Sequence, residues 1–305
     1  MVARGNVGAL MRLSEDPVSS RPLSIVLREA ADRLAVAGVA DPGVDVELLA
    51  AHVLGTSRGG VQAAGIRGDA IQAAEASTLA SLVERRAARV PLQHLTGLAP
   101  FRRLVLRVGP GVFVPRPETE IVAQFAIDAL DAVPSPAPIA VDLGTGSGAL
   151  ALALANEVPH ARVYGVEKSP DAFIWARGNA EYVGASNARI VHGDLDTALP
   201  ELDGTVDVVV SNPPYVPDGA LPRDPEVRFH DPEAALYGGP DGLDVVRRVS
   251  RAALRLVHPG GTVVIEHGEW QGAGVREILA ADGWRAAATH PDLTMRDRAT
   301  TALRP

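Results

Sequence analysis

The sequence predicts an α/β protein with a mostly parallel sheet of seven strands, preceded by a small helical domain that a β-hairpin joins to it. Three observations lead to this fold class. Apolar residues recur at three- and four-residue spacing before about residue 90. A short stretch after that alternates without helical period. The remainder alternates short β-branched runs with helical segments, which is typical of a parallel sheet covered by helices on both faces.

The N-terminal third is expected to form three helices in residues 24–90. The first contains Ser24–Leu34, where apolar residues follow the helical period. The second begins at Asp41-Pro42, because an acid followed by proline is a common helix start. The third covers about residues 70–89. Residues 1–23 have no such period in their larger part, and we expect them to be a flexible tail.

The C-terminal two thirds are expected to form the sheet. Residues 91–117 are assigned to the hairpin linker, with its turn at Gly109-Pro110-Gly111. The α/β domain is assigned to residues 118–305. Its expected strands are Ile139–Leu143, Arg162–Glu167, Ala188–His192, Val206–Ser211, Thr262–His267, Trp284–Thr289 and Thr300–Leu303. Helices between them are expected at Pro170–Val183, Leu243–Val257 and Val275–Ala281.

Composition excludes several classes of protein. The net charge is −8, and the surplus of acids lies in residues 96–305, which argues against non-specific binding to nucleic acid. There are no cysteines, and the eight histidines lack ligand spacing, so we expect no metal site. The only lysine, Lys168, does not follow a glycine, so there is no P-loop. No apolar run could span a membrane and no signal peptide is evident, which together indicate a cytoplasmic protein.

A glycine-rich loop follows the first expected strand of the sheet. Gly144 to Gly148 lie where a strand turns into a helix, and such a loop brings backbone N–H groups close to a ligand. Glu167 ends the second strand, where an acid can accept both hydroxyl groups of a ribose. Asp194 follows the third strand and is placed to accept from an adenine amino group. The loop also satisfies the dinucleotide-binding pattern G-x-G-x-x-A, so these residues leave the cofactor open.

The fourth strand ends in an unusual corner, Asn212-Pro213-Pro214-Tyr215. The prolines stiffen the chain and supply no N–H, so the corner offers an Asn oxygen, bare carbonyls and an aromatic face. This combination fits a planar NH₂ group, because two acceptors take its two hydrogens while the ring stacks on its plane. Such a corner suits methyl transfer to an amide or aromatic amine from a sulfonium cofactor.

Several separated motifs resemble one family. The corner and the glycine loop are similar to those of class I S-adenosylmethionine-dependent methyltransferases, which have a Rossmann-like fold. Three further stretches resemble the release factor glutamine methyltransferases within that class: Pro91–Leu95, Val114–Glu120 and Asp231–Leu243. The resemblance runs from about Leu23 to the C-terminus.

The resemblance implies methylation of the glutamine amide in the Gly-Gly-Gln motif of bacterial class I peptide chain release factors. S-adenosylmethionine would be the methyl donor and S-adenosylhomocysteine the product. The implied cofactor-binding residues are Gly144, Thr145, Gly146, Ser147, Gly148, Glu167, Asp194, Leu195 and Asn212. The implied catalytic and substrate-binding residues are Asn212, Pro213, Pro214 and Tyr215, and Arg116 and Glu118 are further implied to bind substrate.

Other readings of the same residues remain open. An adenine amino methyltransferase of DNA or RNA shares the Asn-Pro-Pro-Tyr corner, although the acidic balance disfavours it. A nicotinamide oxidoreductase shares the glycine loop but leaves the corner unexplained. A non-catalytic scaffold is the third alternative. Two residues depart from the family pattern, because Leu195 replaces a frequent aromatic residue and Met295 replaces a usual glycine. We expect a monomer that binds release factors and no nucleic acid.

Overall fold

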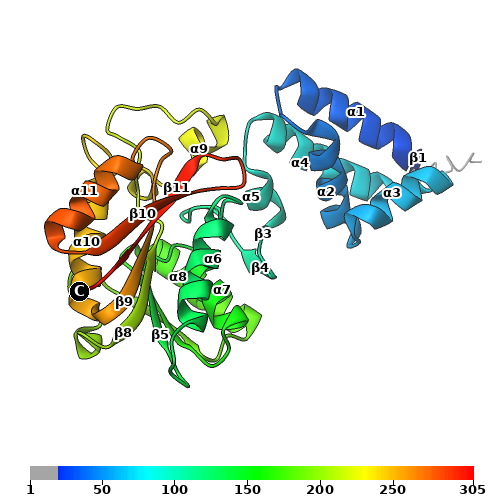
Figure 1. Ribbon diagram of the computed structural model, residues 1–305. Helices are drawn as coiled ribbons and strands as arrows, with labels where there is room; N and C mark the ends of the chain where they lie inside the picture. Colours follow the sequence, from blue (N-terminus) through cyan, green and yellow to red (C-terminus); the bar gives the residue numbers. More distant parts are fainter. Residues whose placement is uncertain (1–19) are drawn as a thin grey trace, which may run out of the picture. The chain divides into compact units, whose positions relative to one another are not determined.

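The computed structural model describes residues 20–305, which form two compact units (Figure 1). The first unit ends at Leu92, and the second runs from Gln93 to Pro305. Most of the expected tail, 1–23, lies outside the described residues. Of its last residues, Arg21–Pro22 form the short strand β1 and Leu23 begins helix α1.

The first unit contains four helices in its described part. Leu34, Leu49 and Leu79 are fully buried between them, and a buried ion pair of 2.6 Å joins Asp45 to Arg86. One helix, Arg58–Arg67, is absent from the predicted pattern, because its glycine-rich sequence has no regular apolar period. The elements are α1 (Leu23–Val36), α2 (Pro42–Leu54), α3 (Arg58–Arg67), β2 (Ala70–Ile71), which pairs with β1, and α4 (Ala73–Ala87).

The second unit begins with a short helix, α5 (Leu92–Thr96), at the boundary and then a hairpin. Strands β3 (Leu98–Phe101) and β4 (Leu104–Arg107) pair antiparallel, with Phe101 opposite Leu104. The turn therefore lies at Arg102-Arg103, and the prediction of a turn at Gly109–Gly111 was wrong. Gly109 is instead packed against the Trp175 ring, where an added Cβ would approach a ring carbon to 2.7 Å.

The sheet of the second unit has seven strands in the order β10-β11-β9-β8-β5-β6-β7. Only β11 runs against its neighbours, so the predicted mostly parallel, seven-stranded sheet is confirmed. The strands are β5 (Ile139–Leu143), β6 (Arg162–Glu167), β7 (Ala188–His192), β8 (Val206–Ser211), β9 (Val257–Glu266), β10 (Arg285–Pro291) and β11 (Asp297–Leu303).

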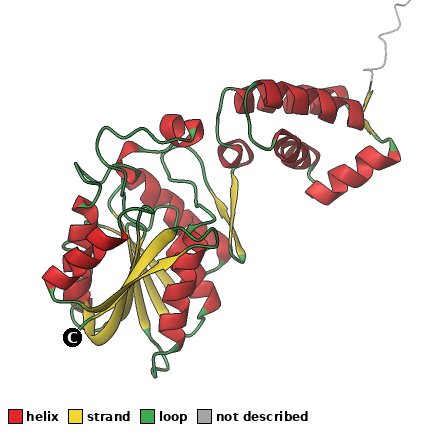
Figure 2. Cartoon of the chain, turned by 45° about the horizontal axis from the view of Figure 1, so that its top comes forward, coloured by secondary structure: helices red, strands yellow, loops and turns green. Residues whose placement is uncertain are grey.

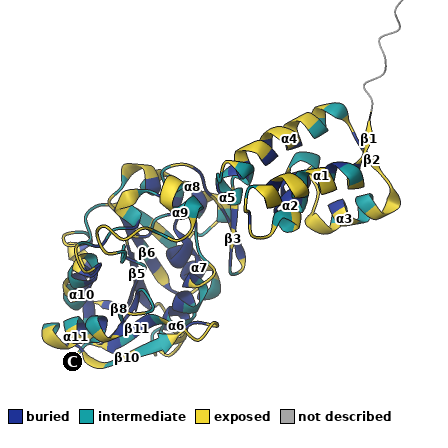
Figure 3. Ribbon diagram, turned by 90° about the horizontal axis from the view of Figure 1, so that it is seen from above, coloured by how far each residue is buried: buried dark blue, intermediate teal, exposed yellow. Residues whose placement is uncertain are grey.

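Helices cover both faces of this sheet (Figure 2). Along β8, Val208 and Val210 enter one core while Val209 enters the other, as the two-residue period of a strand requires. Helices α6 (Thr119–Asp131), α7 (Ala149–Glu157) and α8 (Pro170–Val183) pack on the first face, and α10 (Asp244–Leu256) and α11 (Gly272–Asp282) on the second. Colouring by burial shows the central strands enclosed (Figure 3).

The parallel strands β5, β6, β7, β8 and β9 end at the same edge of the sheet. Glu167 and Glu266 are the last residues of β6 and β9, and the loops after β5, β7 and β8 carry the glycine-rich motif, Asp194 and the Asn-Pro-Pro-Tyr corner. A long connection between β8 and α10 contains helix α9 (Pro225–His230) and a short 3₁₀ turn at Glu233–Ala235. Another 3₁₀ turn, at Pro200–Leu202, precedes β8. In residues 20–305 no helix is both long and apolar enough to cross a membrane.

Candidate active site

The glycine loop is held in place by the strands on either side of it. The backbone N–H groups of Gly144 and Thr145 both donate to the carbonyl of Val166, at 2.9 and 3.0 Å. The Asp142 carboxylate accepts from the Thr145 hydroxyl at 2.5 Å and from the N–H of Ala151 at 3.1 Å. Burial raises the pKa of Asp142 to about 7. The loop is thus fixed before any ligand is bound.

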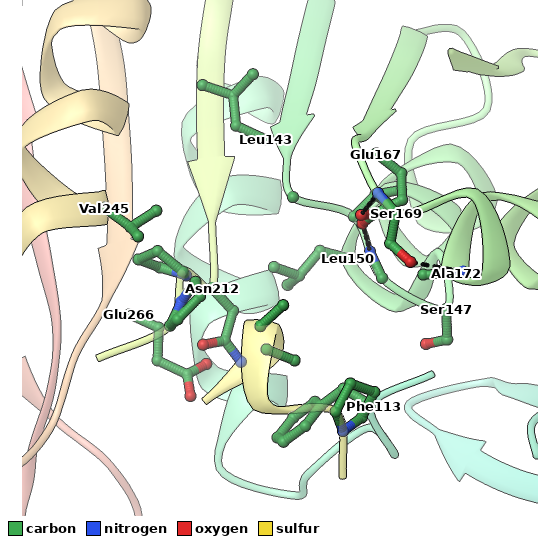
Figure 4. A pocket seen from close by; sticks show the side chains of 18 of the residues that line it. Phe113, Leu143, Ser147, Leu150, Glu167, Ser169, Ala172, Asn212, Val245 and Glu266 are labelled. Carbon is green, nitrogen blue, oxygen red and sulfur yellow. Dashed lines mark hydrogen bonds between the residues drawn. The ribbon is translucent and has the colours of Figure 1, made fainter. Parts of the chain in front are cut away.

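Glu167 closes the loop from the end of β6 (Figure 4). Its Oε2 accepts from the N–H of Gly146 and its Oε1 from the N–H of Ser169, each at 2.8 Å. The side chain is almost buried but lines the cavity beside the loop. A carboxylate has about four acceptor positions, so it retains lone pairs for hydroxyl groups of a ligand.

Asp194 and Leu195 lie beyond β7 on the same wall of the cavity. Asp194 accepts from the guanidinium of Arg248 at 2.6 Å and from the ammonium of Lys168 at 3.0 Å. A hydrogen bond from the N–H of Asp196, with these cations, lowers the pKa of Asp194, so it is ionised at neutral pH. Leu195 packs against the core beneath the loop.

The Asn-Pro-Pro-Tyr corner follows β8 directly. The preceding Ser211 hydroxyl donates to the carbonyl of Leu143 at 2.6 Å, which fixes the corner beside the glycine loop. Asn212 donates from Nδ2 to the Thr119 hydroxyl at 3.2 Å. Among the described residues, none donates to Asn212 Oδ1 or to the carbonyl of Pro213. Two acceptors are therefore free at this end of the cavity.

A strap of residues 231–243 packs on the outer side of the corner. The N–H of Val216 donates to the carbonyl of Leu236 at 2.8 Å, and the N–H of Gly238 donates to the carbonyl of Val216 at 2.9 Å. A Cβ at Gly238 would lie 2.5 Å from the carbonyl oxygen of Pro214, and one at Gly242 would lie 2.3 Å from that of Tyr215. Only glycine fits these positions without displacing the corner.

Arg116 connects the segment before α6 to the same strap. Its guanidinium binds the Asp231 carboxylate at 2.5 Å, and the Asp231 side chain is fully buried. Arg116 also lies over the Phe113 ring, 4.9 Å from its centre. Glu118, two residues later, lines the cavity at the start of α6. Because Arg116 is already paired with Asp231, its side chain helps to hold the wall of the cavity in place and is not simply a free charge for a ligand.

A single cavity of about 760 Å³ joins these elements. Its lining includes every sequence-predicted site residue except Gly148, whose Cβ position would instead contact Leu152 and Ala176. The glycine loop and Glu167 form one end, and the Asn-Pro-Pro-Tyr corner forms the other. The predicted residues therefore converge, and Gly148 has a packing role between helices α7 and α8.

Two buried polar residues of the cavity were not predicted from the sequence. Glu266 ends β9, and Thr119 begins α6; both are nearly inaccessible to solvent yet line the cavity. Burial raises the pKa of Glu266 to about 7, and its Oε2 has no partner among the described residues. The signal for Glu266 was its place at the carboxyl end of a parallel strand. Thr119 had no signal beyond its place in the Val114–Glu120 motif.

Comparison with known proteins decides the family. A Streptomyces coelicolor release factor glutamine methyltransferase is 51% identical over 90% of this chain and 95% of its own length. The chain belongs to the release factor glutamine methyltransferase family. A Mycobacterium tuberculosis release factor glutamine methyltransferase is 42% identical over 92% of both chains. The 4-amino-L-phenylalanine/4-methylamino-L-phenylalanine methyltransferase of Streptomyces pristinaespiralis is 41% identical over 92% of this chain and 95% of its own.

Family models and solved structures agree with this assignment. Residues 26–97 match the PrmC N-terminal domain, and residues 104–225 match the methyltransferase small domain. Among solved structures, a T. thermophilus 16S rRNA N2 G1207 methyltransferase superposes with a TM-score of 0.51 at 21% identity, over 68% of this chain and 50% of its own. At that identity the likeness shows the fold. The predicted class I methyltransferase fold and the recognition of the family are confirmed, and the protein is a methyltransferase.

Proposed function

We propose that this enzyme methylates the side-chain amide nitrogen of the glutamine in the Gly-Gly-Gln motif of bacterial class I peptide chain release factors. S-adenosylmethionine would be the donor, and the enzyme would act as a cytoplasmic monomer. The observation that carries the proposal is the shared cavity: the two free acceptors of the Asn-Pro-Pro-Tyr corner face the same space as the glycine loop. Relatives of 51% and 46% identity that bear this activity in their names support it.

The donor residues of the cavity fit S-adenosylmethionine. The Gly144–Ser147 backbone leaves room for a ligand, Glu167 keeps acceptors for ribose hydroxyl groups, and Asp194 and Leu195 offer a carboxylate and an apolar face near an adenine. When bound, this cofactor supplies a methyl group on a positively charged sulfur.

The corner would orient the acceptor amide. An amide nitrogen is a poor nucleophile, because its lone pair is delocalised into the carbonyl group. Asn212 Oδ1 and the Pro213 carbonyl would each accept one of its two hydrogens, and Tyr215 would lie against its plane. Fixing the nitrogen towards the methyl group contributes orientation, which can lower a barrier by several kcal/mol.

The same hydrogen bonds would strengthen during the reaction. Positive charge develops on nitrogen as the carbon–nitrogen bond forms, and both acceptors carry partial negative charge. The N-methylated, N-protonated amide is strongly acidic, so its proton leaves to water without a dedicated base.

The helical unit is proposed to recognise the protein substrate. A single glutamine offers little to discriminate, so specificity has to come from contacts elsewhere on the release factor. Residues 24–90 contain none of the cofactor or amide motifs, and they coincide largely with the PrmC N-terminal domain match. We therefore assign residues 24–90 to recognition, 91–117 to a linker and 118–305 to catalysis.

A comparison of three acceptors tests the proposed substrate. The enzyme is incubated with radiolabelled S-adenosylmethionine and, separately, a class I release factor, an adenine-containing DNA or RNA oligonucleotide, and 4-amino-L-phenylalanine. Label should enter the release factor with a kcat/KM at least about 100-fold above that for either other acceptor. Preferred labelling of the oligonucleotide or of the aromatic amine would refute the assignment. 4-Amino-L-phenylalanine is included because a relative of 41% identity is named as a methyltransferase of that amino acid.

A further inference from the structure

Three polar side chains lie together at the substrate end of the cavity. Asn212 follows β8, Glu266 ends β9, and Thr119 begins helix α6. Ser211 is in register with Ile265 on the neighbouring strand, so the next residues, Asn212 and Glu266, lie side by side (Figure 4). The Thr119 hydroxyl accepts from Asn212 Nδ2 at 3.2 Å, and Thr119 lines the same cavity as Glu266.

The proposed function needs Asn212 to present one particular end of its carboxamide. The oxygen and nitrogen ends have nearly the same shape, so packing alone does not choose between them. With Oδ1 towards the cavity, Asn212 accepts from the substrate amide. With Nδ2 towards the cavity, two donors would face each other and the substrate N–H would lose its acceptor.

The single hydroxyl hydrogen of Thr119 determines which end of the Asn212 carboxamide faces the cavity. A hydroxyl group donates one hydrogen bond and accepts with its lone pairs. Above its pKa of about 7, Glu266 is a carboxylate that can only accept, and its negative charge favours a Thr119 hydroxyl hydrogen that lies away from Asn212. The hydroxyl lone pairs then accept from Asn212 Nδ2 at 3.2 Å. Oδ1 is left facing the cavity.

We propose that Thr119 and Glu266 are positioning residues for the methyl transfer, which together fix Asn212 with its acceptor oxygen towards the substrate amide. The inference rests on the proposed function, because it assumes an NH₂ group at that oxygen. Two neighbouring groups favour the ionised form of Glu266: Arg298 on β11 adds positive charge, and the Tyr215 hydroxyl lies 3.5 Å from Oε1. The negative charge of Glu118, just before α6, disfavours that ionised form.

The first test uses the substrate-free protein and is independent of activity. The Asn212 side-chain NH₂ resonances are assigned by their loss in Asn212→Ala, and are then compared between wild type and Thr119→Val. The account predicts that a hydrogen-bonded proton of Asn212 moves upfield in Thr119→Val and returns in Thr119→Ser. Unchanged Asn212 resonances in Thr119→Val would overturn the inference, whatever the enzyme methylates.

The second test is a double-mutant cycle on methylation of a release factor. Thr119→Val should lower kcat about tenfold, and Thr119→Ser should recover it to within about threefold. In the Asn212→Ala background, Thr119→Val should change kcat by less than about twofold, because no carboxamide remains to be oriented. Additive losses would overturn the inference, while turnover by wild type shows that the proposed function itself holds.

A matched variant separates orientation from loss of a buried hydroxyl group. Thr300 is also fully buried, and its hydroxyl bonds His267 at 2.9 Å, but it does not line the cavity. Thr300→Val should leave kcat within about twofold of wild type. An equal loss of kcat in Thr300→Val and Thr119→Val would assign the Thr119 effect to general packing and overturn the inference.

Discussion

Replacing Glu167 by Gln exchanges one carboxylate oxygen beside the glycine loop for an NH₂ group, and its effect on cofactor binding can be predicted. The carboxylate accepts from two backbone N–H groups at 2.8 Å, those of Gly146 and Ser169. An amide of the same shape has one oxygen and one NH₂ group, so it serves only one of them. The other backbone N–H then faces a second donor. The loop loses a charge-assisted hydrogen bond, and the cavity loses an acceptor for ribose.

The magnitude follows from the lost hydrogen bond to the ribose, because the hydrogen bond within the loop is lost both with and without the ligand. A hydrogen bond to a charged group contributes about 1.5–3 kcal/mol. The dissociation constant for S-adenosylmethionine should therefore rise by about 10- to 150-fold in Glu167→Gln. Isothermal titration calorimetry measures it directly, after circular dichroism has shown that the variant is folded.

Glu201→Gln is the matched control for this prediction. Glu201 is exposed in the 3₁₀ turn Pro200–Leu202 and does not line the cavity, so the same chemical change there should leave cofactor affinity unaltered. A folded Glu167→Gln variant that binds S-adenosylmethionine within about threefold of wild type would refute the role of this carboxylate.

Three further predictions address the corner, the helical unit and pH. Asn212→Ala should lower methyl transfer by about 100-fold or more while cofactor affinity stays within a few-fold, measured by turnover and calorimetry; near-full turnover would remove Asn212 from the reaction. Deleting residues 1–90 should strongly raise the KM for intact release factor and affect a short Gly-Gly-Gln peptide much less, once circular dichroism confirms folding; equal KM values for intact release factor would exclude a recognition role. Burial raises the pKa of Glu266 from 4.5 to about 7, so the folded state holds this proton more tightly and stability falls as pH rises through that window. Wild type should therefore lose on the order of 3 kcal/mol relative to Glu266→Gln between pH 4 and 8 in chemical denaturation, and parallel pH dependences would show that Glu266 does not titrate there.

The central strands of the sheet could be predicted from the sequence because they are buried on both faces. Such strands are short β-branched runs between turn residues, so β5, β6 and β8 begin and end where the pattern indicates. The more exposed edge strand β7 also has its predicted bounds. The last three strands were predicted shorter than they are. β9 starts at Val257, before the glycine pair that the pattern treats as a turn, and Met295 connects β10 to β11 with a left-handed φ of 63°. That conformation explains why glycine is usual at this position.

The residues around the reacting end could be predicted only in part. Motifs name side chains that face a ligand, and the corner was evident because two prolines and an amide are unusual after a strand. The roles of Thr119 and Glu266 depend instead on the register of β8 and β9 and on where α6 begins. These are tertiary facts, since Thr119 and Asn212 are 93 residues apart in the chain. The hairpin turn at Arg102-Arg103 likewise has no glycine or proline to mark it.

Locating the transferred methyl group tests the central claim most directly. A class I release factor is incubated with the enzyme and S-adenosylmethionine carrying a deuterated methyl group, digested, and sequenced by tandem mass spectrometry. We expect one labelled methyl group on the side-chain nitrogen of the glutamine in the Gly-Gly-Gln peptide, and none when that glutamine is replaced by alanine. A labelled methyl group on any other residue, or an unlabelled release factor despite cofactor binding, would contradict it.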